Sequence, residues 1–149
     1  MGFGPYFLLA TLEGLVSAAV LALTAVGLSL VFGVMRVVNV AHGEFFMMGA
    51  VLAWWCASLV SGNPALGFLI AILLSPLIVA GVALAADRLV LKRLHYEPEA
   101  TIVATIGLLY IIQQLALTFY GAEARPVQAP FDWRIQLPWF GYSGYKFFV

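Results

Sequence analysis

The stretch from Asn39 to Glu44 reads NVAHGE and places an amide, an imidazole and a carboxylate close together in the chain. His42 and Glu44 are residue types that bind metal ions or transfer protons. A zinc site takes three or four protein ligands, however, and no H-E-x-x-H pattern follows. We therefore predict no catalytic, metal-binding or cofactor-binding residue. Two interpretations remain: a solvated connection between helices, or a break in a membrane helix.

The chain around this stretch is too apolar for a soluble protein. Of its 149 residues, 64% are hydrophobic and 9% are charged, whereas about 25% are charged in a typical soluble domain. Three long segments contain neither a charged residue nor a histidine: Gly14–Met35, Phe45–Ala86 and Ala100–Ala122. About 20 apolar residues cross a bilayer. The net charge of zero indicates no nucleic-acid partner. We predict an all-α, polytopic transmembrane helical bundle in a lipid bilayer.

Four membrane spans account for these segments. We predict them at about residues 12–33, 39–60, 65–86 and 101–119. The first begins near residue 12 because a helix from Pro5 to Met35 would be about 46 Å long, well beyond the hydrocarbon core. Residues 5–11 are expected to lead into it along the membrane interface. Ser61–Pro64 separates the second and third spans, since Gly and Pro with Ser and Asn mark a turn.

The second span involves the polar stretch. Its uncharged part, Phe45–Val60, would be about 24 Å long and is too short to cross a bilayer. Residues 39–44 are therefore expected to lie partly at membrane depth or in a re-entrant turn. This favours a broken helix, in which Gly43 relaxes the backbone and Asn39 or His42 bonds the freed polar groups. Gly43→Val is then expected to be more damaging than His42→Gln.

The segment after Phe119 has a different character. Its prolines exclude a continuous helix, and the alternation of apolar and polar residues from Phe131 to Leu137 predicts a short extracytoplasmic strand. Lys146–Val149 has the form of the entry to a fifth span, with a cation followed by apolar residues. We expect residues 1–149 to form a transmembrane domain that is incomplete at its C-terminal end.

Basic residues predict the orientation of the spans. The first connection carries Arg36, and the second, Ser61–Pro64, carries no charge. The third connection contains three basic residues: Arg88, Lys92 and Arg93. Cytoplasmic loops carry an excess of Lys and Arg. We therefore expect the first and third connections in the cytoplasm, and the N-terminus and the C-terminal tail outside.

Small residues at four-residue spacing predict where helices pack closely. They are Gly49, Ala53 and Ala57 in the second span, and Gly81 and Ala85 in the third. Such residues let helix backbones approach one another in lipid. An alanine-rich chain also produces such pairs by chance, and we assign them no role beyond packing.

Residues Gly27–Ala50 resemble the signature of the branched-chain amino acid ABC transporter permeases. The segment reads GLSLVFGVMRVVNVAHGEFFMMGA, and the family pattern is G-L-x-L-I-F-G-V-M-x-x-x-N-F-A-H-G-E-x-x-M-x-G-A. Ala104–Gln114, ATIGLLYIIQQ, is similar to the family's A-T-I-G-L-x-x-I-L-Q-N. Asp87 and Arg88 stand where the family usually has Glu-Arg. Val40 replaces the usual Phe, but the N-x-A-H-G-E core is intact.

The resemblance implies that residues 1–149 are the N-terminal half of a permease subunit, because the family's permeases are about twice this long. That subunit would belong to an ATP-driven importer for branched-chain amino acids or similar small polar solutes such as urea or amides. It implies a second permease subunit, two cytoplasmic ATPase subunits and an extracytoplasmic solute-binding protein as partners, in the inner membrane of a bacterium or archaeon. ATP hydrolysis would occur on the partner subunits. In such a subunit, four residues are candidates for a hinge or gate near the cytoplasmic face: Asn39, His42, Gly43 and Glu44.

Two alternatives remain open at this point. A sugar permease of the same superfamily would have similar spans, but the A-H-G-E core of this sequence argues against it. A structural membrane subunit that transports nothing would also have the same spans.

Overall fold

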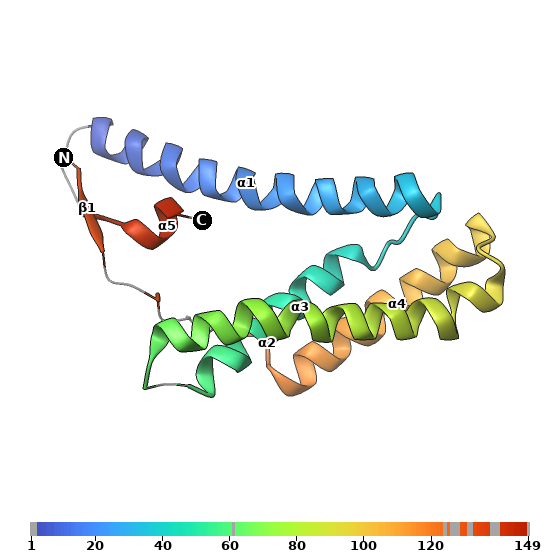
Figure 1. The fold of residues 1–149 in the computed structure, drawn as a ribbon. Helices are drawn as coiled ribbons and strands as arrows, with labels where there is room; N and C mark the ends of the chain where they lie inside the picture. The colour runs from blue at the N-terminus through green and yellow to red at the C-terminus, as the bar shows by residue number, and fades with distance from the viewer. Residues whose placement is uncertain are drawn as a thin grey trace.

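The computed structural model is almost entirely helical (Figure 1). It describes residues 3–60, 62–123, 125, 129–130, 133–137 and 141–148. Its elements are, in chain order, α1 (Phe3–Met35), α2 (His42–Ser58), α3 (Pro64–Leu89), the 3-10 helix η1 (Leu91–Leu94), α4 (Pro98–Phe119), β1 (Arg134–Gln136), β2 (Gly141–Ser143) and α5 (Gly144–Phe148). Three helices of the described chain are long and apolar enough to span a membrane: α1, α3 continued by η1, and α4. The predicted helical class is confirmed.

The first helix is longer than the predicted span. α1 has 33 residues and would extend about 50 Å at 1.5 Å per residue. Pro5 lies in its first turn, where the missing N–H leaves no helical hydrogen bond unmade. Residues 5–11 are thus helical, and the start of the membrane span near residue 12 stays a prediction. α1 ends where Arg36 adopts the left-handed conformation (φ 54°) and donates its N–H to the Phe32 carbonyl over 2.8 Å.

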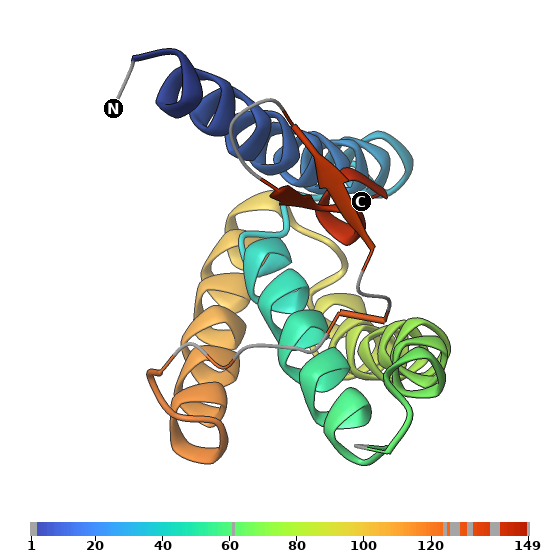
Figure 2. The same cartoon turned by 90° about the vertical axis from the view of Figure 1, so that its left-hand side faces the viewer.

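The second helix is the centre of a three-helix unit. α2 packs along α3 on one side and against α4 on the other, whereas α1 lies apart from this unit (Figures 1 and 2). The Ser75 hydroxyl donates to the Gly49 carbonyl over 2.8 Å and joins α3 to α2. Further along, Gly67 is buried against the Ala57 backbone, so that a Cβ on Gly67 would lie 3.1 Å from the Ala57 carbonyl oxygen.

The predicted small residues divide between two environments. On α2, Gly49 and Ala57 face α3 through the contacts above, and Ala53 lines a cavity beside them. On α3, Gly81 and Ala85 are exposed, and a Cβ on Gly81 would meet no atom within 4 Å. The packing predicted for these two residues is thus not seen within the described chain. The residue of α3 that does touch backbone, Gly67, lies outside the four-residue pattern.

The connections lie at two opposite ends of the molecule (Figure 1). The segment between α1 and α2 shares one end with the turn around η1, and these two segments carry Arg36, Lys92 and Arg93. The turn between α2 and α3 lies at the other end, together with the N-terminus, β1 and α5. The helix directions therefore agree with an arrangement in which the basic connections face one side of a membrane.

A two-stranded hairpin follows α4. β1 pairs with β2 in antiparallel register, with Ile135 opposite Tyr142. The predicted strand is confirmed for residues 134–136, whereas Phe131, Pro126 and Pro138 lie outside the described residues. Gly144 then turns the chain into α5 and donates its N–H to the Trp133 carbonyl over 2.7 Å. A Cβ on Gly144 would lie 2.8 Å from that oxygen, so a larger residue would not fit without a shift.

Candidate functional site

The turn between α1 and α2 is packed against other parts of the chain. Ala41 is fully buried, and Val37 is 3% exposed. The Val40 N–H donates to the Thr105 hydroxyl of α4 over 3.2 Å, and the Asn39 side-chain oxygen accepts from the Ala41 N–H over 3.0 Å. These backbone groups, which no helix satisfies, thus find protein partners. Irregular backbone requires such partners wherever it lies at membrane depth.

His42 begins α2 and reaches across to α1. Its Nε2 lies 3.2 Å from the Thr24 carbonyl oxygen. A carbonyl only accepts hydrogen bonds, so this contact requires the proton to be on Nε2. A Cβ on Gly27 would lie 3.4 Å from the imidazole ring, so the small Gly27 gives the ring room beside α1. We call the contact of His42 with Thr24 and Gly27 the inner contact.

Gly43 and Glu44 occupy the first turn of α2 without a comparable contact. Gly43 is exposed, its φ is not in the left-handed region, and a Cβ there would meet no atom within 4 Å. The Glu44 carboxylate lies at the helix N-terminus, where a negative charge interacts favourably with the helix dipole. The hinge role of Gly43 stays a prediction, but this conformation does not require glycine at that position.

The inner contact predicts that an alanine substitution destabilises the protein more at His42 than at Gly43. His42→Ala removes an interhelical hydrogen bond, which contributes about 0.6–1.7 kcal/mol in membrane proteins, whereas Gly43→Ala adds a methyl group in open space and favours helix. We expect His42→Ala to lower the unfolding temperature of the detergent-solubilised protein and Gly43→Ala to leave it unchanged or slightly raised. Thermal unfolding of both variants measures this. A larger loss with Gly43→Ala would contradict the inner contact.

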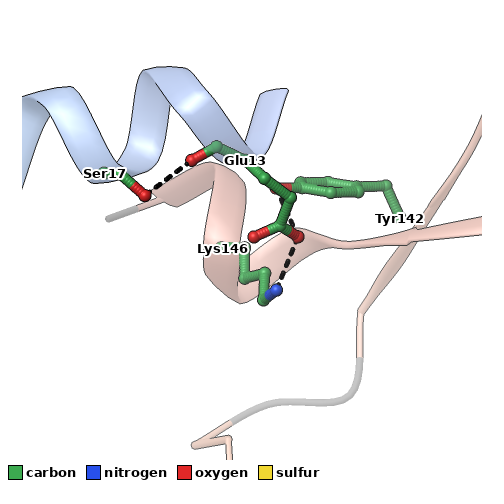
Figure 3. Close-up of polar contacts among 4 residues, drawn as sticks. All are labelled: Glu13, Ser17, Tyr142 and Lys146. Atoms are coloured by element: carbon green, nitrogen blue, oxygen red, sulfur yellow. Dashed lines mark hydrogen bonds and ion pairs between the residues drawn. The ribbon is translucent and has the colours of Figure 1, made fainter. Parts of the chain in front are cut away.

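A second polar contact holds α1 at the opposite end of the molecule (Figure 3). The Lys146 ammonium group lies 2.6 Å from the Glu13 carboxylate, and the Tyr142 hydroxyl lies 3.5 Å from the same oxygen. About half of each charged side chain is exposed. Burial, and after it the Glu13 charge, raises the pKa of the Tyr142 phenol above its ordinary value. We call this group of Glu13, Tyr142 and Lys146 the outer contact.

The outer contact was not predicted from the sequence. Glu13 and Lys146 lie far apart in the chain, and each suits a membrane interface by itself. The signal that could have found the pair is that each is an isolated charge bordering a long apolar segment, on the same predicted side of the membrane. Charged side chains within membrane spans pair with one another or with backbone carbonyls.

The turn around η1 brings the Tyr96 phenol close to the Asp87 carboxylate. His95 and Tyr96 both have left-handed backbones, with φ of 52° and 56°. Loss of hydration raises the pKa of Tyr96 above its ordinary value, and the neighbouring Asp87 carboxylate raises it further. Arg88, Lys92 and Arg93 are all exposed here, as expected for residues that face water. Among the residues that the structure describes, no group of three or more His, Cys, Asp or Glu side chains could hold a metal ion.

Comparison with known protein families gives one finding that covers most of the chain. The family described as "Branched-chain amino acid transport system / permease component" matches residues 10–138. The matched region contains the inner contact, Glu13 of the outer contact, and α2, α3 and α4 complete. No curated protein and no solved structure matches the chain.

Proposed function

The chain belongs to the family of branched-chain amino acid transport system permease components, and we propose that its inner contact is the cytoplasmic gate of such a permease. The family makes the chain a permease component of an ABC-type transport system, a multi-pass membrane protein and a transport subunit, not a catalytic one. The family also implies ATPase and solute-binding partner subunits. A sugar permease and a structural subunit without transport activity are thereby set aside.

The proposal includes the number of membrane spans, their orientation and the other subunits of the transporter. Besides α1, α3 and α4, α2 also crosses the membrane. It has 17 residues, and residues 39–41 supply the rest of the length that is needed to cross. Lys146 begins a fifth span. The basic connections face the cytoplasm of a bacterial or archaeal cell, and the hairpin lies on the extracytoplasmic side of the inner membrane. A second permease subunit and two ATPases complete the assembly. The burial of Ala41 and the agreement of the helix directions with the basic connections support this arrangement.

The gate rests on one observation, the hydrogen bond from His42 to the Thr24 carbonyl. None of the described α1 residues from 4 to 34 is buried, so α1 gains little from packing within this chain. The inner and outer contacts are two polar ties between α1 and other elements of the described chain. A helix tied at two ends can part from its neighbours at one end while it keeps the other. Alternating access needs a change of this kind.

Cross-linking α1 to α2 tests the gate. In a Gly27→Cys/His42→Cys double variant, a short reversible bis-methanethiosulfonate reagent joins the two helices at the inner contact. Cys56 is fully buried in α2 and is replaced by Ala to leave no other thiol. We expect cross-linking of the complete transporter to stop uptake of branched-chain amino acids, and reductant to restore it. The reduced protein is its own control. Undiminished uptake by the cross-linked protein would contradict the gate.

A further inference from the structure

The hydroxyl of Thr101, in the first turn of α4, is buried without a hydrogen-bond partner. The Thr101 side chain is fully buried, and its Oγ1 bonds no donor or acceptor among the residues that the structure describes. The other threonine hydroxyls of the chain each donate to the carbonyl oxygen one helical turn earlier: those of Thr11, Thr24, Thr105 and Thr118. A buried hydroxyl without a partner lowers stability, and native structures contain few such groups.

Thr105 shows what kind of group the Thr101 hydroxyl would bond. It lies one helical turn further along α4 and is also fully buried, and its Oγ1 accepts the Val40 N–H of the turn between α1 and α2 over 3.2 Å. Residues four apart lie on the same face of a helix and are about 6 Å apart along its axis. One face of α4 thus carries two buried hydroxyls, and the Val40 N–H bonds one of them.

The turn between α1 and α2 is built so that it can move along α4. Residues 36–39 belong to no helix or strand, so no helix has to break for them to shift. Thr101 lies nearer than Thr105 to the end of the molecule where the basic connections lie and α4 begins (Figure 1). A shift toward that end carries the Val40 N–H from one hydroxyl to the other. The N–H then keeps a protein partner, which backbone at membrane depth requires.

We infer that Thr101 is a positioning residue of the cytoplasmic gate, whose hydroxyl accepts the Val40 N–H when the gate is open, as Thr105 does when it is closed. Steps of one helical turn between packed elements are a known form of switching between two discrete states. His42 follows the turn directly, and a step of about 6 Å would break its 3.2 Å contact with the Thr24 carbonyl. The two hydrogen bonds therefore change together. The inference rests on the proposed gate and names the group that holds its second state.

Thr101→Val tests the inference, because valine has the same branched shape as threonine but lacks the hydroxyl. We expect the unfolding temperature of the solubilised protein to be unchanged or raised, since an unpaired buried hydroxyl is removed. The maximal rate of L-leucine uptake by the complete transporter, corrected for the amount assembled, should fall about three- to tenfold. An interhelical hydrogen bond in a membrane protein changes an equilibrium by about this factor. Thr101→Ser keeps the hydroxyl and should restore uptake.

Thr105→Val is the matched control one turn further along α4. It removes the acceptor that the Val40 N–H uses in this structure. The unfolding temperature should therefore fall with Thr105→Val and not with Thr101→Val. This difference separates a hydroxyl that supports the present state from one that supports the second state.

The same measurements can overturn the inference. If Thr101→Val unfolds at a lower temperature than the wild type or fails to assemble, the hydroxyl supports the present state and the inference is wrong. Normal uptake by Thr101→Val, or low uptake that Thr101→Ser does not restore, would also contradict it. The gate itself is judged by the Gly27→Cys/His42→Cys cross-link. If that cross-link stops uptake while Thr101→Val transports normally, the gate stands and only the role of Thr101 is excluded.

Discussion

Gly67→Val is expected to lower the unfolding temperature of the solubilised protein and the yield of assembled transporter. Gly67 is buried on α3, and a Cβ there would lie 3.1 Å from the Ala57 carbonyl oxygen and 3.4 Å from the Ala57 Cα. These are backbone atoms of α2, so no side chain can rotate away, and valine would also add two methyl groups. Overpacking of this kind costs about 1–3 kcal/mol. Thermal unfolding in detergent measures the loss.

Gly81→Val is the matched control, because it makes the same change on the same helix. Gly81 is exposed, and a Cβ there would meet no atom within 4 Å. The unfolding temperature of this variant should equal that of the wild type. Equal losses for the two variants would show that the effect comes from valine in α3 and not from contact with α2.

Ala41→Leu is expected to abolish most uptake by the complete transporter. Ala41 is fully buried where the turn packs against α4. Its N–H is held by Asn39, and its carbonyl accepts from the Glu44 N–H over 3.1 Å. A leucine there would push the turn from α4 and disturb the start of α2. Uptake of labelled L-leucine into cells, corrected for the amount of transporter, measures the effect.

Val40→Phe is the control for this substitution. It adds more carbon atoms than Ala41→Leu, but Val40 is 38% exposed, and its backbone N–H, not its side chain, makes the contact with Thr105. Phenylalanine is also the residue usual in the family at this position. Uptake should stay close to that of the wild type. Loss of uptake with Val40→Phe and retention with Ala41→Leu would contradict the packing of the turn.

The features that could be predicted from the sequence are those that neighbouring residues determine. Long apolar segments predicted α3 and α4 within a few residues, since a helix satisfies its own backbone in lipid. The predicted break separates α2, which ends at Ser58, from α3, which begins at Pro64, and Asn63 caps α3 by accepting the Leu66 N–H. The extended strand was predicted from alternation, and residues 134–136 form it.

The features that could not be predicted depend on residues far apart in the chain. Whether His42 bonds solvent or the Thr24 carbonyl depends on how α1 lies against α2, and no local pattern specifies that. The role of Gly67 depends on which face of α3 meets Ala57. The span predicted from residue 12 does not give the start of α1 at Phe3, since membrane thickness limits a span and a helix can extend beyond the bilayer.

The most direct test of the cytoplasmic gate is a distance measurement across it. Spin labels at Val34 of α1 and Leu89 of α3 lie on exposed residues near the basic connections. Pulsed electron paramagnetic resonance on the complete transporter would compare the nucleotide-free state with the vanadate-trapped state. We predict that the Val34–Leu89 distance differs between the two states, whereas a pair within the three-helix unit, Leu89 and Val103, keeps its distance. An unchanged Val34–Leu89 distance through the ATPase cycle would contradict a gate between α1 and α2.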